Sequence, residues 1–197
     1  MAKRAFDILV TLLISPVALI VGGVFAVILA VDLRGSPFFV QRRVGKGGRL
    51  FPMYKLRTMR HARAGEVKPY VIEDWKTYVF SPPGERDPRL TRWGELARKL
   101  SADEIPNLVN VLRGDMSLVG PRPEIPEIVR QYPPEYHRRH TVAPGIAGLA
   151  QVHGRSDLPY DAIMQYDLAY VDSHSVLTDV QILLKTAAIV VTRSGAR

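Results

Sequence analysis

The sequence predicts a mostly helical α+β fold, with a membrane-length helix first and then a small domain that contains a β-hairpin. Three observations lead to this prediction. An uncharged apolar run covers residues 8–31, two strand-like segments flank a glycine-rich turn at 45–48, and later segments repeat apolar residues at helical spacing. We expect a boundary at residue 36, which gives a membrane helix over 1–36 and a second domain over 37–197.

The opening run is long enough to cross a bilayer. Its 24 residues would make a helix of about 36 Å, too long for the apolar region of a cleaved signal peptide. Pro16 cannot donate to the carbonyl of Leu12, so the helix should bend or break there, and Ser15 can bond the freed backbone locally. Two interpretations stay open: a kinked spanning helix, and a helix that turns back to the side it entered.

Basic residues flank this run on both sides, which favours the cytoplasmic side for both of its ends. Nine Lys and Arg and no Asp or Glu lie between residues 33 and 65. Directly after a membrane-length segment, such a block favours anionic lipid or a phosphorylated ligand. No nucleic-acid-binding motif accompanies the charge, so we expect no nucleic acid partner. The absence of cysteine excludes disulfides, iron–sulfur clusters, thiolate zinc sites and cysteine nucleophiles.

The hairpin should pair Phe38–Val44 with Arg49–Arg57, and Pro52 marks the second strand as an edge. Helices are predicted over 92–99, over 105–113 with Gly114 as its stop, over 160–171 and over 179–192. For the apolar face of the last helix we favour packing in the core, and contact with a membrane surface is the alternative.

Asp103 and Glu104 are adjacent acids at a predicted helix start. Ser101 as N-cap would place Pro106 at the fifth helical position, where its missing N–H costs a bond. With Asp103 as N-cap, Pro106 falls inside the first turn, where no N–H is needed. Composition alone favours capping over catalysis for Asp103, although an ionised acid beside free N–H groups also lies where phosphate binds well.

Arg122 strengthens the catalytic interpretation. It lies between two prolines, which hold its backbone extended, and a rigid arginine suits bidentate phosphate binding. Arg98, Lys55 and Arg57 supply further cations. Two acids with Mg²⁺ and basic clamps form a phosphoryl-transfer arrangement, whereas adjacent acids cannot easily flank a glycosidic bond. The stretch from His137 to His140 is expected to be a solvated basic turn rather than a metal site.

Four stretches carry a family resemblance: "KRAFDILVTLLISP", "FFVQRRVGKGGRLFPMYKLRTM", "RKLSADEIPNLVNVLRGDMSLVGPRP" and "VAPGIAGLAQVHGR". Together they resemble the bacterial sugar transferases, which are monotopic polyprenyl-phosphate phosphoglycosyl transferases. The resemblance covers almost the whole chain. Ala102 stands where the family usually has Leu, and Leu149 where Trp is common.

The resemblance implies transfer of a phospho-sugar from a UDP-sugar to undecaprenyl phosphate, with release of UMP. It implies that Asp103 is the nucleophile, that a phosphosugar-aspartyl intermediate forms, and that Mg²⁺ binds at Asp103. Glu104 would position the metal or activate the lipid phosphate. Arg98 and Arg122 would hold phosphate. The weaker substrate-binding assignments are Lys55, Arg57, Gln151 and Arg155.

The resemblance also implies that Ser15 and Pro16 form the break of a re-entrant membrane helix. A small catalytic domain would then work on the cytoplasmic face of the bacterial inner membrane, in contact with its lipid, to start a glycan such as an exopolysaccharide. The chain is similar to a minimal catalytic unit of the family. The sugar, the pathway and the oligomeric state are not specified by these residues.

A non-catalytic membrane adaptor is the alternative function. It would bind anionic lipid through the basic block that follows the apolar run. This alternative explains the charge and the run, but it gives Asp103, Glu104 and Arg122 no common purpose.

Overall fold

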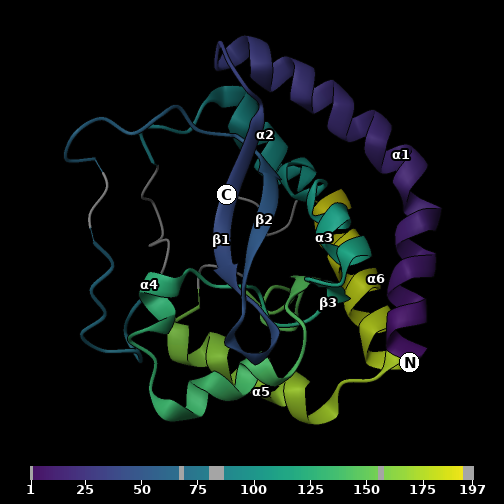
Figure 1. Ribbon diagram of the computed structural model, residues 1–197, viewed down its shortest axis with the longest axis vertical. Coiled ribbons are helices and arrows are strands. Elements are labelled where there is room, and N and C mark those ends of the chain that lie inside the picture. The colour runs from purple at the N-terminus through teal and green to yellow at the C-terminus, as the bar shows by residue number, and fades with distance from the viewer. Residues whose placement is uncertain (1, 67–68, 80–86, 155–157, 193–197) are drawn as a thin grey trace.

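The computed structural model describes residues 2–66, 69–79, 87–154 and 158–192, and it confirms a mostly helical chain with one hairpin (Figure 1). A long first helix runs along one side of the body, which is formed by the described residues that follow this helix. The hairpin lies in the middle of the view. The elements, in chain order, are α1 (Ala2–Asp32), β1 (Phe38–Val44), η1 (Lys46–Gly48), β2 (Leu50–Leu56), α2 (Arg92–Lys99), η2 (Ala102–Glu104), α3 (Asn107–Arg113), β3 (Ser117–Val119), α4 (Pro126–Val129), η3 (Pro134–Thr141), β4 (Gly145–Ala147), α5 (Tyr160–Ser173) and α6 (Val176–Thr192).

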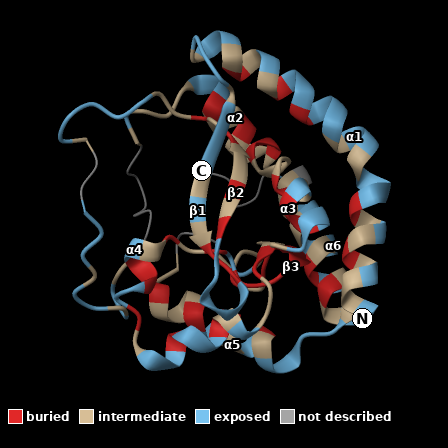
Figure 2. Cartoon of the chain, viewed as in Figure 1, coloured by how far each residue is buried: buried red, intermediate tan, exposed pale blue. Residues whose placement is uncertain are grey.

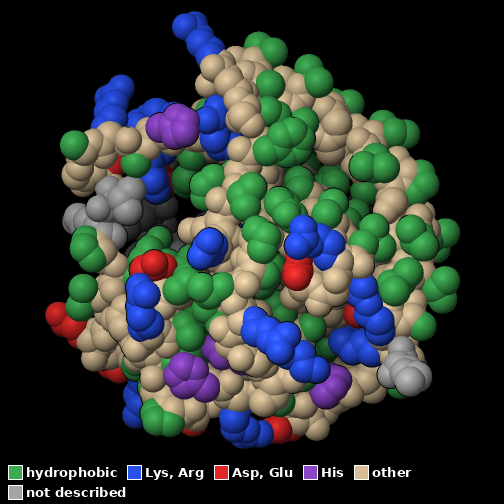
Figure 3. All heavy atoms as spheres, viewed as in Figure 1, with side chains coloured by type: hydrophobic (Ala, Val, Ile, Leu, Met, Phe, Trp, Pro, Cys, Tyr) green, Lys and Arg blue, Asp and Glu red, His purple; other side chains and the backbone are tan. Residues whose placement is uncertain are grey.

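Helix α1 continues through Pro16 and curves around the body instead of ending there (Figure 1). The hydroxyl of Ser15 donates to the carbonyl of Thr11 at 2.7 Å, which satisfies one backbone group beside the proline. The outer face of the helix is exposed and apolar, with Leu13 79% and Leu19 71% accessible (Figures 2 and 3). Among the described helices, α1 is the one long and apolar enough to cross a membrane.

Both ends of α1 are attached to the rest of the chain. At its start, the ammonium group of Lys3 lies 2.5 Å from the carboxylate of Asp179 in α6. At its end, Phe25 and Leu29 pack in a cluster with Leu56 of the hairpin. Apolar burial and an ion pair therefore hold the two ends against one body.

The hairpin forms as predicted, with Phe38 opposite Leu56 and Val44 opposite Leu50. Gly47 adopts a φ of 66°, which a residue with a side chain takes only at a cost. Asn110 of α3 is fully buried and holds β2 from the side: its amide nitrogen donates to Pro52 O at 2.7 Å, and its amide oxygen accepts from Tyr54 N at 3.1 Å. One side chain thus supplies bonds that a third strand would make.

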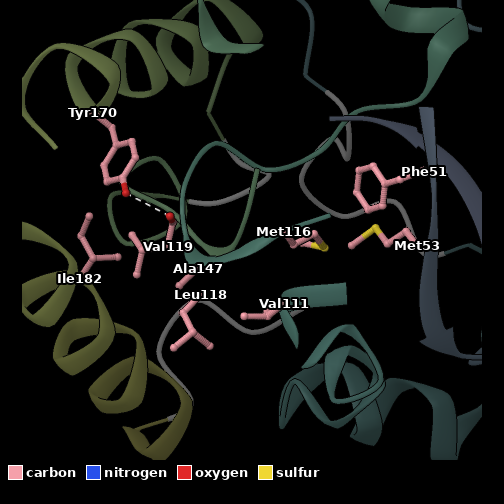
Figure 4. Packing of buried hydrophobic residues seen from close by; sticks show 9 residues of the cluster. All are labelled: Phe51, Met53, Val111, Met116, Leu118, Val119, Ala147, Tyr170 and Ile182. Atoms are coloured by element: carbon pink, nitrogen blue, oxygen red, sulfur yellow. Dashed lines mark hydrogen bonds between the residues drawn. The ribbon is translucent and has the colours of Figure 1, made fainter. Parts of the chain in front are cut away.

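Strands β3 and β4 pair in parallel and lie in the main core. Figure 4 shows this core as a continuous row of side chains that runs from Phe51 and Met53 of the hairpin to Tyr170 and Ile182 of the last two helices. The backbones approach so closely that a Cβ on Gly145 would lie 2.0 Å from the nitrogen of Gly120. No side chain fits between the two backbones at this point. The close pairing of β3 with β4 therefore fixes the position of the segment that follows β3.

The prediction of Asp103 as an N-cap is wrong. Helix α3 begins at Asn107, and residues 102–104 form the separate 3₁₀ turn η2. Ser101 adopts a φ of 54°, which reverses the chain before the acids, and Ile105 N then bonds back to the carbonyl of Ala102. These tighter i to i+3 bonds prevent a regular helix from starting at Asp103.

The other helices are close to expectation, but only part of the apolar face of α6 packs in the core: Leu183 is partly buried against the main cluster, and much of the face is exposed. Helix α2 has the predicted bounds, α5 extends to Ser173, and α6 starts three residues early at Val176. Leu184 is 67% exposed, and Ala187 and Ala188 are exposed too, whereas Asp179 and Ile182 are buried. The ion pair of Asp179 with the start of α1 orients α6 with its polar Asp179 side inward.

Candidate active site

Turn η2 places the two acids at the junction of α2 and α3. Ala102 is 1% exposed and packs in the cluster that also holds Ala97 and Leu56, so it anchors the turn. Asp103 is 9% exposed, and the side chain of Glu104 is 14% exposed. Two carboxylates therefore lie side by side in a largely desolvated position, which is costly unless cations accompany them.

Cations do accompany Glu104. One of its carboxylate oxygens, Oε1, lies 3.1 Å from Lys55 Nζ and 2.7 Å from Arg122 Nη2. Burial acts to raise the pKa of Glu104, but Arg122 and Lys55 outweigh it and hold that pKa well below its usual range. Burial lowers the pKa of Lys55, and Glu104 opposes this effect. Glu104 is therefore ionised, and its Oε1 is engaged in two ion pairs.

Asp103 is in the opposite situation. No described residue donates a hydrogen bond to its carboxylate, although Asp103 lies within the electrostatic reach of Lys55, Arg98 and Arg122. Burial and the neighbouring Glu104 raise its pKa to about 6, against the pull of those cations. Asp103 thus offers an uncommitted carboxylate in an electropositive surrounding, as a nucleophile or a ligand of a phosphate-bound cation requires.

Arg98 reaches the site from the last turn of α2. Its Nε donates to the buried hydroxyl of Thr58 at 3.0 Å, which fixes the plane of the guanidinium. Helix α2 can approach Thr58 because residue 94 is glycine: a Cβ there would lie 2.0 Å from the Thr58 carbonyl oxygen. Burial lowers the pKa of Arg98, and Asp103 counteracts that effect.

The segment that carries Arg122 is held along its whole length. Each of the four carbonyl groups from residue 121 to 124 accepts a hydrogen bond. The donors, in that order, are Gly145 N at 2.9 Å, Arg139 Nη2 at 2.7 Å, Arg43 Nη1 at 3.2 Å and Val44 N at 2.9 Å. The two flanking prolines have no N–H to satisfy, and the four bonded carbonyl groups hold this backbone firmly in place.

Three predicted site residues lie elsewhere or outside the described residues. Arg57 contacts His61 Nε2 at 2.8 Å and Leu33 O at 3.5 Å, which places its guanidinium near the end of α1 and not at the acids. Gln151 donates from Nε2 to Ile146 O at 2.9 Å. Arg155 lies outside the described residues. Substrate binding by these three stays a prediction.

Sequence reasoning missed the buried support of this site. The stretch from His137 to His140 was expected to be solvated, and for Arg139 that is wrong, because its side chain is 3% exposed. Arg139 pairs with Asp167 of α5 at 2.5 Å, and Arg43 pairs with Glu124 at 2.9 Å. The partners are far apart in the sequence, so no local pattern signals these pairs.

The donor set suits Mg²⁺ in part. Among the described residues, no group of three or more acidic or histidine side chains could hold a metal ion. Of the two acids at this turn, Asp103 is the one whose carboxylate accepts no hydrogen bond from a described residue, and carboxylate oxygen is the ligand type that Mg²⁺ prefers. A magnesium ion here would take most of its ligands from water and from substrate phosphates, which is usual for this ion.

Residues 1–193 match the family model of the bacterial sugar transferases. The chain belongs to this family. It is 36% identical over 200 residues to the galactosyl transferase CpsE of Streptococcus agalactiae, an alignment that covers 100% of the chain and 43% of CpsE.

Two further relatives differ in length. The chain is 38% identical over 204 residues to the undecaprenyl-phosphate galactose phosphotransferase of Salmonella typhimurium, which covers 98% of the chain and 41% of that protein. It is 35% identical over 207 residues to the exopolysaccharide production protein ExoY of Sinorhizobium fredii, with 99% and 88% covered. The chain therefore spans less than half of the first two relatives and most of ExoY.

Proposed function

We propose that this chain transfers a sugar phosphate from a UDP-sugar to undecaprenyl phosphate through a covalent intermediate on Asp103. The observation that carries the proposal is the uncommitted, buried carboxylate of Asp103 beside Lys55, Arg98 and Arg122. The name of the Salmonella relative, an undecaprenyl-phosphate galactose phosphotransferase, supports the lipid acceptor. Adjacent carboxylates and clamping cations match phosphoryl transfer.

The reaction divides into two displacements at one phosphorus atom. A carboxylate oxygen of Asp103 attacks the phosphorus that carries the sugar; the bond to the UMP oxygen breaks, and UMP leaves with that electron pair. An oxygen of undecaprenyl phosphate then attacks the same phosphorus, the bond to Asp103 breaks, and the polyprenyl-diphosphate sugar forms. A carboxylate nucleophile divides one difficult transfer into two easier ones.

The other charged groups stabilise this chemistry. Arg98 and Arg122 hold the diphosphate, and Glu104 keeps Arg122 and Lys55 in place through its paired oxygen. Bound Mg²⁺, with Asp103 among its ligands, would neutralise phosphate charge. The surroundings favour ionised Asp103 near neutral pH, since burial raises its pKa only to about 6.

We further propose that α1 is a re-entrant anchor on the cytoplasmic face of the inner membrane. Both of its ends contact one body, through Lys3 at the start and through Phe25 and Leu29 at the end. This arrangement is hard to reconcile with ends on opposite sides of a bilayer about 30 Å thick. The site would then meet the lipid carrier at the headgroups.

The test is UMP release by the purified chain in nanodiscs with undecaprenyl phosphate, Mg²⁺ and a panel of UDP-sugars. We expect release with one or a few donors, and Asp103→Asn should abolish it. Asp172→Asn is the matched control, because the side chain of Asp172 is exposed and its one ion pair with a described residue is with Arg138. Without lipid acceptor, the wild-type protein should gain the mass of one sugar phosphate on Asp103.

Two outcomes would contradict the proposal. One is UMP release by Asp103→Asn at the wild-type rate. The other is a folded, membrane-bound wild-type protein that releases no UMP from any donor, which would favour the adaptor. The structure gives the adaptor little support, since Lys55 and Arg43 of the basic block are committed to Glu104 and Glu124 rather than to solvent.

A further inference from the structure

A buried ion pair contacts the backbone of the segment that carries Arg122. Arg139 of η3 and Asp167 of α5 are 3% and 2% exposed, and Arg139 Nη2 lies 2.5 Å from Asp167 Oδ2. A buried ion pair of this kind contributes little net stability compared with apolar residues of similar volume. Its presence therefore suggests a purpose other than stability.

The pair makes one direct link to the site. Arg139 Nη2 also donates to the backbone carbonyl of Arg122 at 2.7 Å. Its Nη1 donates to the hydroxyl of Tyr132 at 2.5 Å. One guanidinium thus connects a carboxylate, a phenol and the backbone of the arginine that pairs with Glu104.

The phenol extends the network to the other end of the same segment. Tyr160 donates its hydroxyl proton to Glu124 Oε2 at 3.0 Å, so the bond of 2.7 Å between Tyr132 and Tyr160 carries the proton of Tyr132. Glu124 accepts in turn from Arg43, which donates to the carbonyl of residue 123 as well. The network therefore encloses residues 122–124 from both ends.

The side chain of Arg122 has little support of its own. It is 44% exposed, and Glu104 is its one polar partner among the described residues. The direction of the guanidinium consequently depends on the orientation of its backbone, which the buried network determines. An error of about 1 Å in such a group can reduce a catalysed rate by about a hundredfold.

We propose that Arg139, held by Asp167 and Tyr132, is a positioning residue that fixes the backbone of Arg122 for phosphate binding and transfer. The inference rests on the proposed function and adds residues that do not touch the substrate. A lysine cannot replace Arg139, because a single ammonium nitrogen cannot reach all three partners that the planar guanidinium reaches with two nitrogens.

The test compares matched variants by steady-state UMP release in nanodiscs, with a donor that the wild-type protein uses. Arg139→Lys should lower kcat by about tenfold or more and change KM by less than about threefold, because the phosphate ligands remain but are misaligned. Tyr132→Phe should lower kcat by about threefold to tenfold. Tyr136→Phe is the control. Tyr136 lies on η3 with Arg139 and in the same apolar cluster as Tyr132, but its hydroxyl donates to Asp161 and not to the Arg122 network.

A double-variant cycle separates positioning from general loss of structure. If Arg139 acts through Arg122, then Arg139→Lys should cost less than about twofold in kcat once Arg122→Ala is present. Losses that multiply would overturn the inference, and so would wild-type kinetics in Arg139→Lys. Thermal unfolding of each variant accompanies the kinetics, and Tyr132→Phe, which removes a single hydroxyl, decides the question if Arg139→Lys does not fold.

The two proposals fail in different ways. A wild-type protein that releases no UMP with any donor contradicts the proposed function. An active wild-type protein in which Arg139→Lys and Tyr132→Phe match Tyr136→Phe contradicts the positioning inference alone.

Discussion

Two neighbouring acids have different properties because their surroundings differ. Glu104 is ion-paired with Lys55 and Arg122, whereas Asp103, one residue away, has the same cations nearby but no hydrogen bond from any described residue. A paired acid positions its partners, and an unpaired one is available to react. The family resemblance implied separate roles for the two acids, but the sequence could not show that Glu104 is ion-paired and Asp103 is not, because Lys55 and Arg122 reach Glu104 only after folding.

At the residue scale, His140 should make the stability of the fold depend on pH. Burial, then Arg139 and His137, lower its pKa to about 4, from about 6.5 in an unfolded chain. The unfolded state therefore binds more protons at this site between these values, so the contribution of His140 to stability should fall as pH drops from about 6.5 to about 4, by at most about 1.4 kcal/mol per pH unit. Asp103 and Asp167, whose pKa burial raises to about 6, contribute in the opposite direction over part of this window.

Thermal unfolding in detergent at a series of pH values measures this effect. His140→Gln should lose less stability than the wild-type protein as pH drops through that window, and His174→Gln, at an exposed position, should keep the wild-type dependence. Equal slopes for the wild-type protein and His140→Gln would contradict the assignment to His140.

At the element scale, local patterns predicted most elements and distant contacts decided the exceptions. The hairpin, α2 and α5 follow from turn residues and periodicity that act within a few positions. The face of α6 depends on the pair between Lys3 and Asp179, which are 176 residues apart. The prediction of Asp103 as N-cap failed because of Ser101, whose left-handed backbone conformation is not indicated by its residue type.

Two buried asparagines on α3 allow a matched test of how that helix holds the hairpin. Both are 0% exposed, but Asn110 bonds Pro52 and Tyr54 of β2, whereas neither amide atom of Asn107 has a hydrogen-bond partner among the described residues. Asn110→Leu should destabilise the protein by about 2–4 kcal/mol, because it leaves two backbone groups of β2 unsatisfied.

Asn107→Leu should be neutral or stabilising, since it removes polar atoms that make no bond. Chemical denaturation of both variants gives the comparison. A similar loss in the two would mean that volume rather than hydrogen bonding determines the cost, and it would remove the argument for Asn110 as a substitute for a strand.

At the scale of the whole molecule, the exposed apolar surface includes α1 and parts of the two helices that α1 packs against. Leu13 and Leu19 of α1, Val109 of α3 and Leu184 of α6 are all at least half exposed, and α1 packs against both of the other helices (Figure 3). A soluble protein rarely exposes so many large apolar side chains together. The acids and their cations lie in the body that holds both ends of α1, so a membrane around α1 would bring that body to its surface.

This arrangement predicts that both ends of α1 face the cytoplasm. The chain has no cysteine, so Ala2→Cys and Ser36→Cys each introduce a unique label at an exposed position. In intact spheroplasts, a membrane-impermeant maleimide should label neither variant, and both should react after permeabilisation, like the Ser175→Cys control in the loop before α6. Labelling of position 2 alone, or of position 36 alone, from outside would show a spanning helix. A spanning helix would have to lose the contact of Lys3 or that of Phe25 with the body. Loss of the Lys3 contact would be costly, because it would leave the buried carboxylate of Asp179 without its ion-pair partner.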